Sequence, residues 1–169
     1  MDWPPVSEII MLLHIKGSNK ATRKLVESAT WFYAEKLLGK RLMGSLEITI
    51  NLKKNLLTKD GNEGSAIWED DSYRPKEFII ELDTTVKIRN LLITLAHEMV
   101  HVKQWAKDEM YEYMNVAGLV RFKGEKIHLE LTDYWDYPWE IEAYGKQLGL
   151  FVRFCEYMGF EREDMKEEA

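Results

Sequence analysis

Two histidines four residues apart lie inside a long stretch whose apolar residues repeat at helical spacing. They belong to the sequence His97-Glu98-Met99-Val100-His101, which has the form H-E-x-x-H. The spacing predicts a helix over residues 86–110, with Thr84 or Thr85 as its N-cap. The apolar stripe of this helix consists of Leu91, Leu92, Leu95, Met99 and Val100. Because residues i and i+4 lie one above the other on a helix, both imidazoles share one face.

This arrangement suits a zinc site. Two imidazoles on one helix face can bind a single Zn²⁺ with bonds of about 2.0–2.1 Å. Glu98 follows the first histidine and can reach a water molecule at the metal without binding the metal itself. Zinc lowers the pKa of such a water towards about 7, so that a glutamate can take its proton as general base. The alternative interpretation is two surface histidines on an ordinary helix.

A catalytic zinc site needs a third protein ligand, and the composition leaves few candidates. The chain contains four histidines, so beyond the motif only His14 and His128 can supply an imidazole. The single cysteine, Cys155, excludes an internal disulfide and a zinc site built from four cysteines. Cys155 falls on the apolar stripe of a predicted helix, and we expect it to be buried. Carboxylates are abundant and are the other possible ligands.

One downstream segment offers two such carboxylates: Pro138-Trp139-Glu140-Ile141-Glu142-Ala143-Tyr144-Gly145. Proline is favourable at the first position of a helix, and a carboxylate in the first turn interacts well with the helix dipole. We therefore predict a helix over residues 139–158 with Glu140 in its first turn. The small Ala143 would let this helix approach the H-E-x-x-H helix closely. The alternative is plain N-terminal charge on a surface helix.

The two segments together resemble a known family. The stretch Leu91-Leu92-Ile93-Thr94-Leu95-Ala96-His97-Glu98-Met99-Val100-His101 is similar to the metal-binding helix of SprT-like and related zincin peptidases. The segment from Pro138 to Tyr144 resembles the glutamate helix of small gluzincins, the ImmA-like and related group. Over residues 78–158 the chain therefore resembles the small SprT-like or minigluzincin metallopeptidases of phage and bacterial genomes.

The resemblance implies a third zinc ligand. In the gluzincin pattern this ligand is a glutamate three residues before a small alanine, which implies Glu140, with Glu142 as the alternate. The residue after that alanine is often Asp or Asn in those families and is Tyr144 here. In SprT proteins the third ligand is a histidine soon after the motif, and the candidate is His128, 27 residues beyond His101. His128 alternates with apolar neighbours, which is more typical of an ordinary strand residue.

The resemblance also implies an activity and further site residues. It implies one Zn²⁺ per chain and a zinc metallopeptidase that hydrolyses peptide bonds with Glu98 as general base. A tyrosine or histidine often stabilises the oxyanion in such sites. Tyr144, one turn beyond Glu140, is the first candidate; the others are Tyr134, Tyr137 and His128. The substrate backbone usually pairs with an edge strand, and the strand implied is the segment of residues 77–83. The alternative is a buried central strand, because the successive Phe78, Ile79 and Ile80 allow either position.

Three residues near the motif are expected to support the site. Gln104 and Thr94 lie on nearby faces of the predicted helix and can orient the metal ligands. Trp105 lies one turn after His101 and is expected to pack beside it.

Hydrophobic periodicity along the rest of the chain predicts an α+β fold, and the resemblance implies a zincin-like one. A small antiparallel or mixed sheet would pack on the H-E-x-x-H helix, with the C-terminal glutamate helix beside it. We predict a short helix over residues 9–13 behind Ser7, a helix over 21–38, strands over 46–52, 65–69 and 78–82, a hairpin around 122–126 and an aromatic loop over 133–138. One domain is expected over residues 1–160, followed by an acidic tail over 161–169.

The charge balance limits the partners. The chain has 23 Lys+Arg and 29 Asp+Glu, a formal net charge of −6. With this charge and a pI near 5.3, the chain lacks the excess of basic residues that is typical of a general nucleic-acid binder. The N-terminus has no positive n-region, and its apolar run is too short to span a bilayer. We therefore expect a cytoplasmic protein whose partner is a protein or peptide substrate, without direct nucleic-acid or membrane contact, and leave its oligomeric state open.

The sequence also allows two rival functions. The first is an SprT-like protease that acts near DNA and uses His128 as third ligand. The second is a zinc-stabilised binding module without turnover. Glu98 distinguishes the second from an enzyme, because a purely structural site does not need this glutamate.

Overall fold

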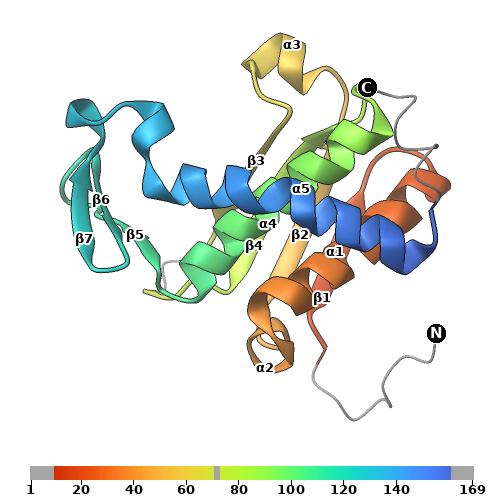
Figure 1. Ribbon diagram of the computed structural model, residues 1–169, viewed down its shortest axis with the longest axis horizontal. Coiled ribbons are helices and arrows are strands. Elements are labelled where there is room, and N and C mark those ends of the chain that lie inside the picture. The colour runs from red at the N-terminus through yellow and green to blue at the C-terminus, as the bar shows by residue number, and fades with distance from the viewer. Residues whose placement is uncertain (1–9, 71–72, 161–169) are drawn as a thin grey trace.

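The computed structural model of the protein describes residues 10–70 and 73–160, which adopt a mixed α+β fold with two small sheets (Figure 1). The larger sheet contains β1 (Leu12–Lys16), β2 (Glu47–Lys53), β3 (Gly64–Trp68) and β4 (Glu77–Asp83). The smaller sheet contains β5 (Met110–Glu112), β6 (Leu119–Phe122) and β7 (Glu125–His128). The helices are α1 (Lys20–Leu38), α2 (Lys40–Met43), α3 (Leu56–Asp60), α4 (Ile88–Ala106) and α5 (Pro138–Met158), with 3₁₀ turns η1 (Leu129–Leu131) and η2 (Tyr134–Asp136).

Most of the predicted elements are confirmed. Helices α1 and α5 and strands β2, β3 and β4 each agree with the predicted ranges to within one residue at either end. The hairpin is also confirmed, since β6 and β7 pair through a two-residue turn at Lys123 and Gly124, both with positive φ. The predicted N-cap Ser7 and the acidic tail over 161–169 lie outside the described residues.

The short helix predicted over residues 9–13 is wrong. Residue 9 lies outside the described residues, residues 10 and 11 are not helical, and Leu12 and Leu13 begin strand β1, which pairs in parallel with β2. The sequence of β1 alternates between outward-facing Leu12 and His14 and the partly buried Leu13 and Ile15, which pack against the core. This two-residue period is that of a strand with one buried face. Five residues of alternation are too short a signal to outweigh the apolar cluster that suggested a helix.

The larger sheet has the order β1-β2-β4-β3, with β3 as its antiparallel edge strand. Strand β4 was implied to be the edge strand, and this is wrong, because β4 lies between β2 and β3. The physical reason is the connection: β3 precedes β4 in the chain and folds back on it, so that it covers the side of β4 that β2 leaves open. The edge that faces away from β4 therefore belongs to β3.

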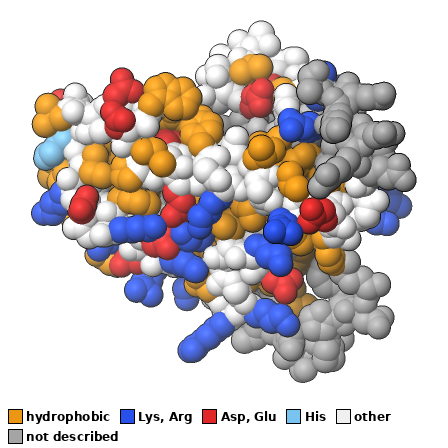
Figure 2. Space-filling view, in the orientation of Figure 1, with side chains coloured by type: hydrophobic (Ala, Val, Ile, Leu, Met, Phe, Trp, Pro, Cys, Tyr) orange, Lys and Arg blue, Asp and Glu red, His pale blue; other side chains and the backbone are white. Residues whose placement is uncertain are grey.

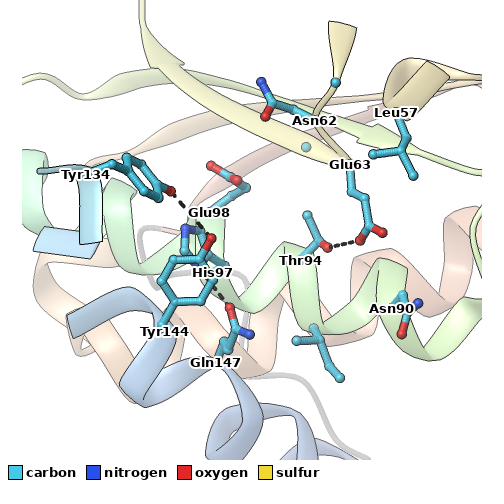
Figure 3. A pocket seen from close by; sticks show the side chains of 13 residues that line it. Leu57, Asn62, Glu63, Asn90, Thr94, His97, Glu98, Tyr134, Tyr144 and Gln147 are labelled. Atoms are coloured by element: carbon cyan, nitrogen blue, oxygen red, sulfur yellow. Dashed lines mark hydrogen bonds between the residues drawn. The ribbon is translucent and has the colours of Figure 1, made fainter. Parts of the chain in front are cut away.

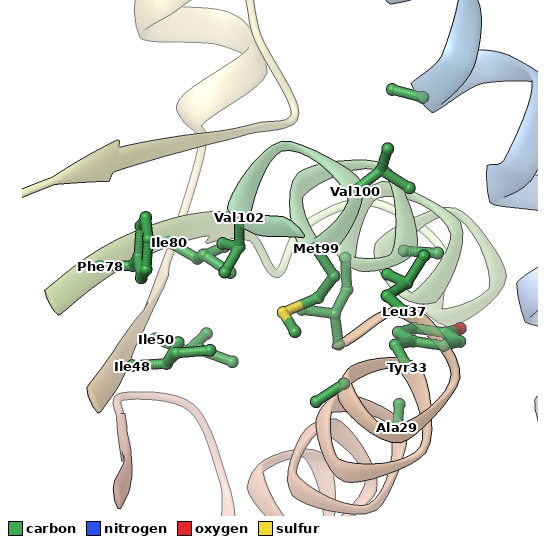
Figure 4. Packing of buried hydrophobic residues seen from close by; sticks show 14 of the residues in the cluster. Ala29, Tyr33, Leu37, Ile48, Ile50, Phe78, Ile80, Met99, Val100 and Val102 are labelled. Atoms are coloured by element: carbon green, nitrogen blue, oxygen red, sulfur yellow. The ribbon is translucent and has the colours of Figure 1, made fainter. Parts of the chain in front are cut away.

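The protein has three layers. Helices α1 and α4 cover one face of the larger sheet, and α5 crosses α4 on the side away from the sheet (Figure 1). In Figure 4, apolar side chains of the sheet face Met99 and Val102 of α4, with Tyr33 of α1 beside them. The sheet contributes Ile48, Ile50, Phe78 and Ile80, all of them buried. Helix α4 is thus packed on both sides, which fixes the position of its H-E-x-x-H segment.

Gly64, the first residue of β3, allows this edge strand to run close to α4. A Cβ atom at Gly64 would lie 2.6 Å from Cγ2 of Thr94 and 3.1 Å from the carbonyl oxygen of Glu81. Any side chain at this position would push β3 away from α4. Glycine therefore sets the distance between the edge strand and the H-E-x-x-H helix.

Helix α4 ends at Ala106, four residues before the predicted end at Met110. Lys107 caps the helix, and Asp108 has a φ of 56°, a left-handed conformation that a helix cannot continue. The chain then enters β5, whose first residue is Met110. Among the described residues, none of the helices combines the length and the apolar character needed to cross a bilayer.

Candidate metal centre

Side chains of α4 and α5 meet at one point between these two helices. The Nε2 atoms of His97 and His101 are 3.1 Å apart. Glu140 approaches both, with Oε2 3.2 Å from Nε2 of His97 and Oε1 3.5 Å from Nε2 of His101. The three residues offer ligand atoms that all lie within 4.8 Å of one another. The structure therefore brings together the two motif histidines and the predicted third residue, in an arrangement that can hold a metal ion.

Helix α5 brings Glu140 to the histidines by close packing. Pro138 is the first residue of the helix, as predicted, and Glu140 is in its first turn. Ala143 is fully buried one turn later. The burial of this small residue is compatible with the close approach of the two helices that the sequence predicts.

Two glutamines fix the orientation of the imidazoles. Nδ1 of His97 is 2.9 Å from Oε1 of Gln147, and Nδ1 of His101 is 2.9 Å from Oε1 of Gln104. An amide oxygen only accepts hydrogen bonds, so each Nδ1 carries the proton and donates it. Both Nε2 atoms then present lone pairs toward the same point, as metal-bound histidines do.

Glu140 is the residue whose environment fits a cation best. Its Oε2 atom is buried and has no hydrogen-bond partner, although His97 Nε2 is 3.2 Å away. In a buried site it is unfavourable for two imidazole lone pairs to face a carboxylate oxygen that accepts no hydrogen bond. A positive charge between them removes this cost. This donor set, two imidazoles and one carboxylate, therefore fits a divalent metal ion.

The pKa shifts of Glu140 and His101 also indicate that this place favours a positive charge beside the carboxylate. Burial raises the pKa of Glu140, but interactions with His101 and His97 outweigh burial and hold the pKa well below its usual range. Burial lowers the pKa of His101, but Glu140, Glu98 and Gln104 outweigh it, so that this pKa is raised. The site thus favours a negative carboxylate next to positive charge.

Glu98 lies beside the group without belonging to it. Its side chain is buried and lines a pocket that also contains His97. Burial raises the pKa of Glu98, and the nearby His101 and His97 only partly offset this. A carboxylate with a raised pKa next to an open site is a suitable proton acceptor and donor at neutral pH.

Glu142, the alternate ligand, has other partners. Its Oε1 accepts hydrogen bonds from Lys103 Nζ at 2.9 Å and Gln104 Nε2 at 3.1 Å, and its Oε2 accepts one from Lys123 Nζ at 2.9 Å. Burial raises its pKa, but these donors outweigh it and lower the pKa to about 2. Through Gln104, Glu142 supports His101 from behind rather than joining the metal group.

His128 lies apart from the site. It is the exposed last residue of β7 and is neither in the metal group nor in the pocket lining. Its ordinary strand position, expected from the alternation of β7, is confirmed. His14, on β1, hydrogen-bonds to Glu47 and is also outside the group.

A pocket of about 520 Å³ opens beside the metal group, between α4, α5, η2 and the loop before β3. Figure 3 shows Tyr134 and Tyr144 at one end of this pocket, next to His97 and Glu98. The rest of the lining includes Leu57, Asn62, Glu63, Asn90, Ile93 and Thr94. A volume of this size accommodates one or two side chains of an extended peptide.

Two of the candidate tyrosines line this pocket. The ring of Tyr144 lies 4.6 Å from the ring of His97, and its hydroxyl is 3.4 Å from that of Tyr134 (Figure 3). Burial, Tyr144 and Glu140 raise the pKa of Tyr134, which keeps its hydroxyl protonated as a donor. Tyr137 instead donates its hydroxyl to the carbonyl oxygen of Leu129. The structure therefore leaves Tyr134 and Tyr144 as the tyrosine donors at the site.

Comparisons of the chain with protein-family models, with curated proteins and with solved structures find no match.

The expectations for supporting residues are partly confirmed. Trp105 packs beside His101, with ring centroids 5.9 Å apart, and Gln104 binds His101 as expected. Thr94 does not contact a ligand; its hydroxyl donates to Glu63 Oε2 at 3.2 Å. Cys155 is buried, and burial raises its pKa to about 11, as for a structural thiol.

Three functional neighbours were not predicted: Gln147, Lys103 and Glu63. Gln147 lies seven residues beyond Glu140, two turns along α5 on the same face, so helical spacing could have identified it. Lys103 is buried between Glu109 and Glu142. Its partners come from the loop before β5 and from α5, and no local signal indicates them.

Exposed aromatic side chains surround the mouth of the pocket. Trp135, on η2, is 66% exposed, and its ring lies 5.4 Å from that of Tyr144. Figure 2 shows hydrophobic side chains gathered at the end of the molecule that carries the η turns and the small sheet. The approach to the site is thus apolar on this side.

Proposed function

We propose that the protein is a zinc-dependent metallopeptidase of the gluzincin kind, with His97, His101 and Glu140 as zinc ligands. The observation that supports this most is the short distance between the potential ligand atoms. The two Nε2 atoms lie 3.1 Å apart, and Glu140 approaches each of them with one carboxylate oxygen, Oε2 at 3.2 Å from His97 and Oε1 at 3.5 Å from His101. Ligand atoms of a tetrahedral zinc ion with bonds of about 2.0–2.1 Å lie about 3.3 Å apart. Three protein ligands leave the fourth position open, which is typical of a catalytic rather than a structural site.

Glu98 is the proposed general base. Zinc at this position would acidify a water molecule and polarise the carbonyl group of the substrate. Glu98 accepts the proton of the attacking water and passes it to the nitrogen of the leaving amine. Its burial and raised pKa suit both steps, since the group must first take and then release the proton.

Tyr144 is the proposed donor to the oxyanion that develops on the attacked carbonyl. Its ring contacts that of His97, and its hydroxyl is near that of Tyr134. A hydroxyl aimed at developing negative charge stabilises the transition state more than the ground state. Tyr134 holds the Tyr144 hydroxyl in place and is the second donor at the pocket.

The proposed substrate is a peptide in extended conformation, paired with β3. This strand is the antiparallel edge of the sheet, it packs against α4, and its residues Ser65 and Ile67 are exposed. An edge strand offers unpaired backbone donors and acceptors to a peptide. The recognition mode is the one implied by the resemblance, but the strand that pairs with the peptide is β3 and not β4.

The position of His128 does not support the alternative of an SprT-like protease with a third histidine. This residue is exposed and belongs neither to the metal group nor to the pocket lining, which leaves it without a role in the site. The pocket next to Glu98 likewise favours an enzyme over a non-catalytic zinc-stabilised module, because a scaffold needs neither a buried base nor an open cavity.

The proposal is tested by incubating the zinc-loaded protein with a mixed peptide library and identifying the cleaved bonds by mass spectrometry. We expect cleavage by the wild type and a loss of at least 100-fold in Glu98→Gln, which keeps all three zinc ligands. The matched control is Glu130→Gln, on exposed η1, which should cleave like the wild type. Equal cleavage by Glu98→Gln and wild type would contradict the proposal.

A further inference from the structure

The pocket beside the metal group extends well beyond it, along α4 toward the N-terminus of that helix. Its lining includes Thr94, one turn before His97, and Asn90, one turn earlier still. One helical turn advances about 5.4 Å, so this part of the pocket begins within a side chain's length of the metal group. In Figure 3, Glu63 and Thr94 lie in the middle and Asn90 and Leu57 at the far end, away from Tyr144. We call this part, lined by Leu57, Asn62, Glu63, Asn90, Ile93 and Thr94, the distal subsite.

Glu63 gives the distal subsite a negative charge. Glu63 and Glu98 are acidic residues of the pocket lining, which contains no lysine or arginine within the described parts of the chain. Glu63 is partly buried, and Oε2 accepts a hydrogen bond from the Thr94 hydroxyl at 3.2 Å. None of the ion pairs among residues 10–70 and 73–160 involves Glu63. A partly desolvated carboxylate without a cationic partner attracts a positive group from a ligand.

The backbone holds Glu63 firmly at this place. Its carbonyl oxygen accepts a hydrogen bond from the backbone N–H of Asp83 at 2.8 Å. The next residue, Gly64, starts β3 and lets it lie against Thr94. The carboxylate therefore occupies a fixed position over α4, beside the strand that we propose to pair with the substrate.

The remaining walls suit a long amphipathic side chain. Leu57 and Ile93 offer apolar contact, and Asn62 and Asn90 offer amide oxygens that can accept hydrogen bonds. Lysine and arginine side chains have an apolar stem and a charged end, so that the stem can lie on the apolar residues while the end reaches Glu63. A glutamate or aspartate of the substrate would meet a like charge in the same place.

We propose that the distal subsite binds a lysine or arginine side chain of the substrate, next to the bond that is cleaved, and that Glu63 determines this preference. The inference rests on the proposed peptidase function. It adds the chemical class of substrate, a peptide with a basic residue beside the scissile bond. Glu63 contacts this side chain and takes no part in proton transfer.

The test compares peptides that contain arginine with the same peptides containing citrulline, which has nearly the same shape without the charge. In cleavage by the wild type, we expect arginine to be favoured over citrulline by about tenfold at one position next to the scissile bond. In Glu63→Gln the ratio should fall to about one, and Glu63→Lys should favour glutamate at that position. Glu69→Gln, on an exposed residue just beyond the other end of β3, is the matched control and should keep the wild-type ratio.

A binding measurement separates this inference from the proposed function. The zinc-loaded Glu98→Gln protein is titrated with the two peptides by calorimetry, with and without the additional Glu63→Gln change. About tenfold tighter binding of the arginine peptide, abolished by Glu63→Gln, supports the distal subsite even if no peptide is cleaved. Equal binding of the two peptides, or a preference for the arginine peptide that survives Glu63→Gln, overturns the distal subsite. This holds even if the wild type is shown to cleave peptides.

Discussion

Gln147 holds His97 through a hydrogen bond of 2.9 Å between Oε1 and Nδ1, from the same helix that supplies Glu140. Helix α5 thus provides both the carboxylate of the metal group and the amide that orients one of its imidazoles. A shift of α5 relative to α4 would disturb both at once. The packing of α5 against α4 therefore has direct consequences for the metal group.

Replacing Gln147 by alanine should weaken zinc binding. Without the amide acceptor, the ring of His97 is free to turn and to change tautomer, and loss of such a partner typically costs about 10–100-fold in metal affinity. The affinity is measured by competition with a chromophoric chelator. Gln147→Glu keeps an acceptor and should bind nearly as the wild type does. Lys146→Ala, at the exposed neighbouring position, is the control. An unchanged affinity in Gln147→Ala would show that the hydrogen bond has no role in the site.

The buried Lys103 should matter far more for stability than the exposed Lys123, although both bind Glu142. The Lys103 side chain is 8% exposed and also pairs with Glu109, whereas that of Lys123 is 52% exposed. Removal of one partner from a buried pair costs about 3–5 kcal/mol, and exposed pairs contribute about 0–1 kcal/mol. We expect Lys103→Met to lower the free energy of unfolding in urea by about 3 kcal/mol and Lys123→Met by less than about 1 kcal/mol. Equal effects would refute this difference.

The carboxylate of Asp83 should make stability depend on pH in the acid range. Burial raises its pKa, but hydrogen bonds from Thr85, Leu57 and Asn55 outweigh it, and the pKa is lowered. The ionised group therefore stabilises the protein above its unfolded pKa of about 3.9, and this stabilisation is lost as pH falls through the lower folded pKa.

Asp83→Asn tests this directly. At pH 7 the variant should be less stable than the wild type by about 1–3 kcal/mol, because asparagine cannot accept the same set of charge-assisted hydrogen bonds. The difference should shrink below about pH 4, where Asp83 of the unfolded wild type begins to take up a proton while the folded carboxylate stays ionised to lower pH. Urea unfolding at pH 7, 4 and 3 gives the three values. A difference that stays constant over this range would be inconsistent with the lowered pKa.

A side chain at Gly64 should separate β3 from α4. Gly64→Ala places a methyl group 2.6 Å from Cγ2 of Thr94, and we expect a loss of about 1–3 kcal/mol in unfolding free energy. Thr94→Ser removes that methyl group, so the double variant should recover part of the loss, a non-additive result. Gly145→Ala, in α5 with nothing within 4 Å, should instead stabilise the protein slightly. Additive effects at positions 64 and 94 would contradict the close contact.

The parts of the site that depend on one helix were predictable from the sequence. The shared face of His97 and His101 follows from their spacing alone, and Trp105 and Gln104 follow from the next turn. The partner Glu140 was identified because the sequence marks both a helix start at Pro138 and a resemblance to known glutamate helices. These signals lie within a few residues of each other, where local rules are reliable.

The parts that depend on distant segments were not predictable in this way. The place of β4 inside the sheet is decided by how β3 folds back on it, and alternation along one strand carries no information about its neighbours. Strand β1 is short, and its parallel pairing with β2 outweighs a weak local preference for helix. The contacts of Lys103 and Glu63 join elements far apart in the chain, so only the folded structure reveals them.

Zinc content measured at a fixed free zinc concentration tests the central claim most directly. Wild type, Glu140→Ala, Glu142→Ala and His128→Ala are equilibrated in the same zinc buffer and analysed by mass spectrometry of the metal. We expect one zinc per chain in the wild type and in His128→Ala, slightly less in Glu142→Ala, and a large loss in Glu140→Ala. Full zinc content in Glu140→Ala, or loss of zinc in His128→Ala, would contradict the assignment of His97, His101 and Glu140 as the metal ligands.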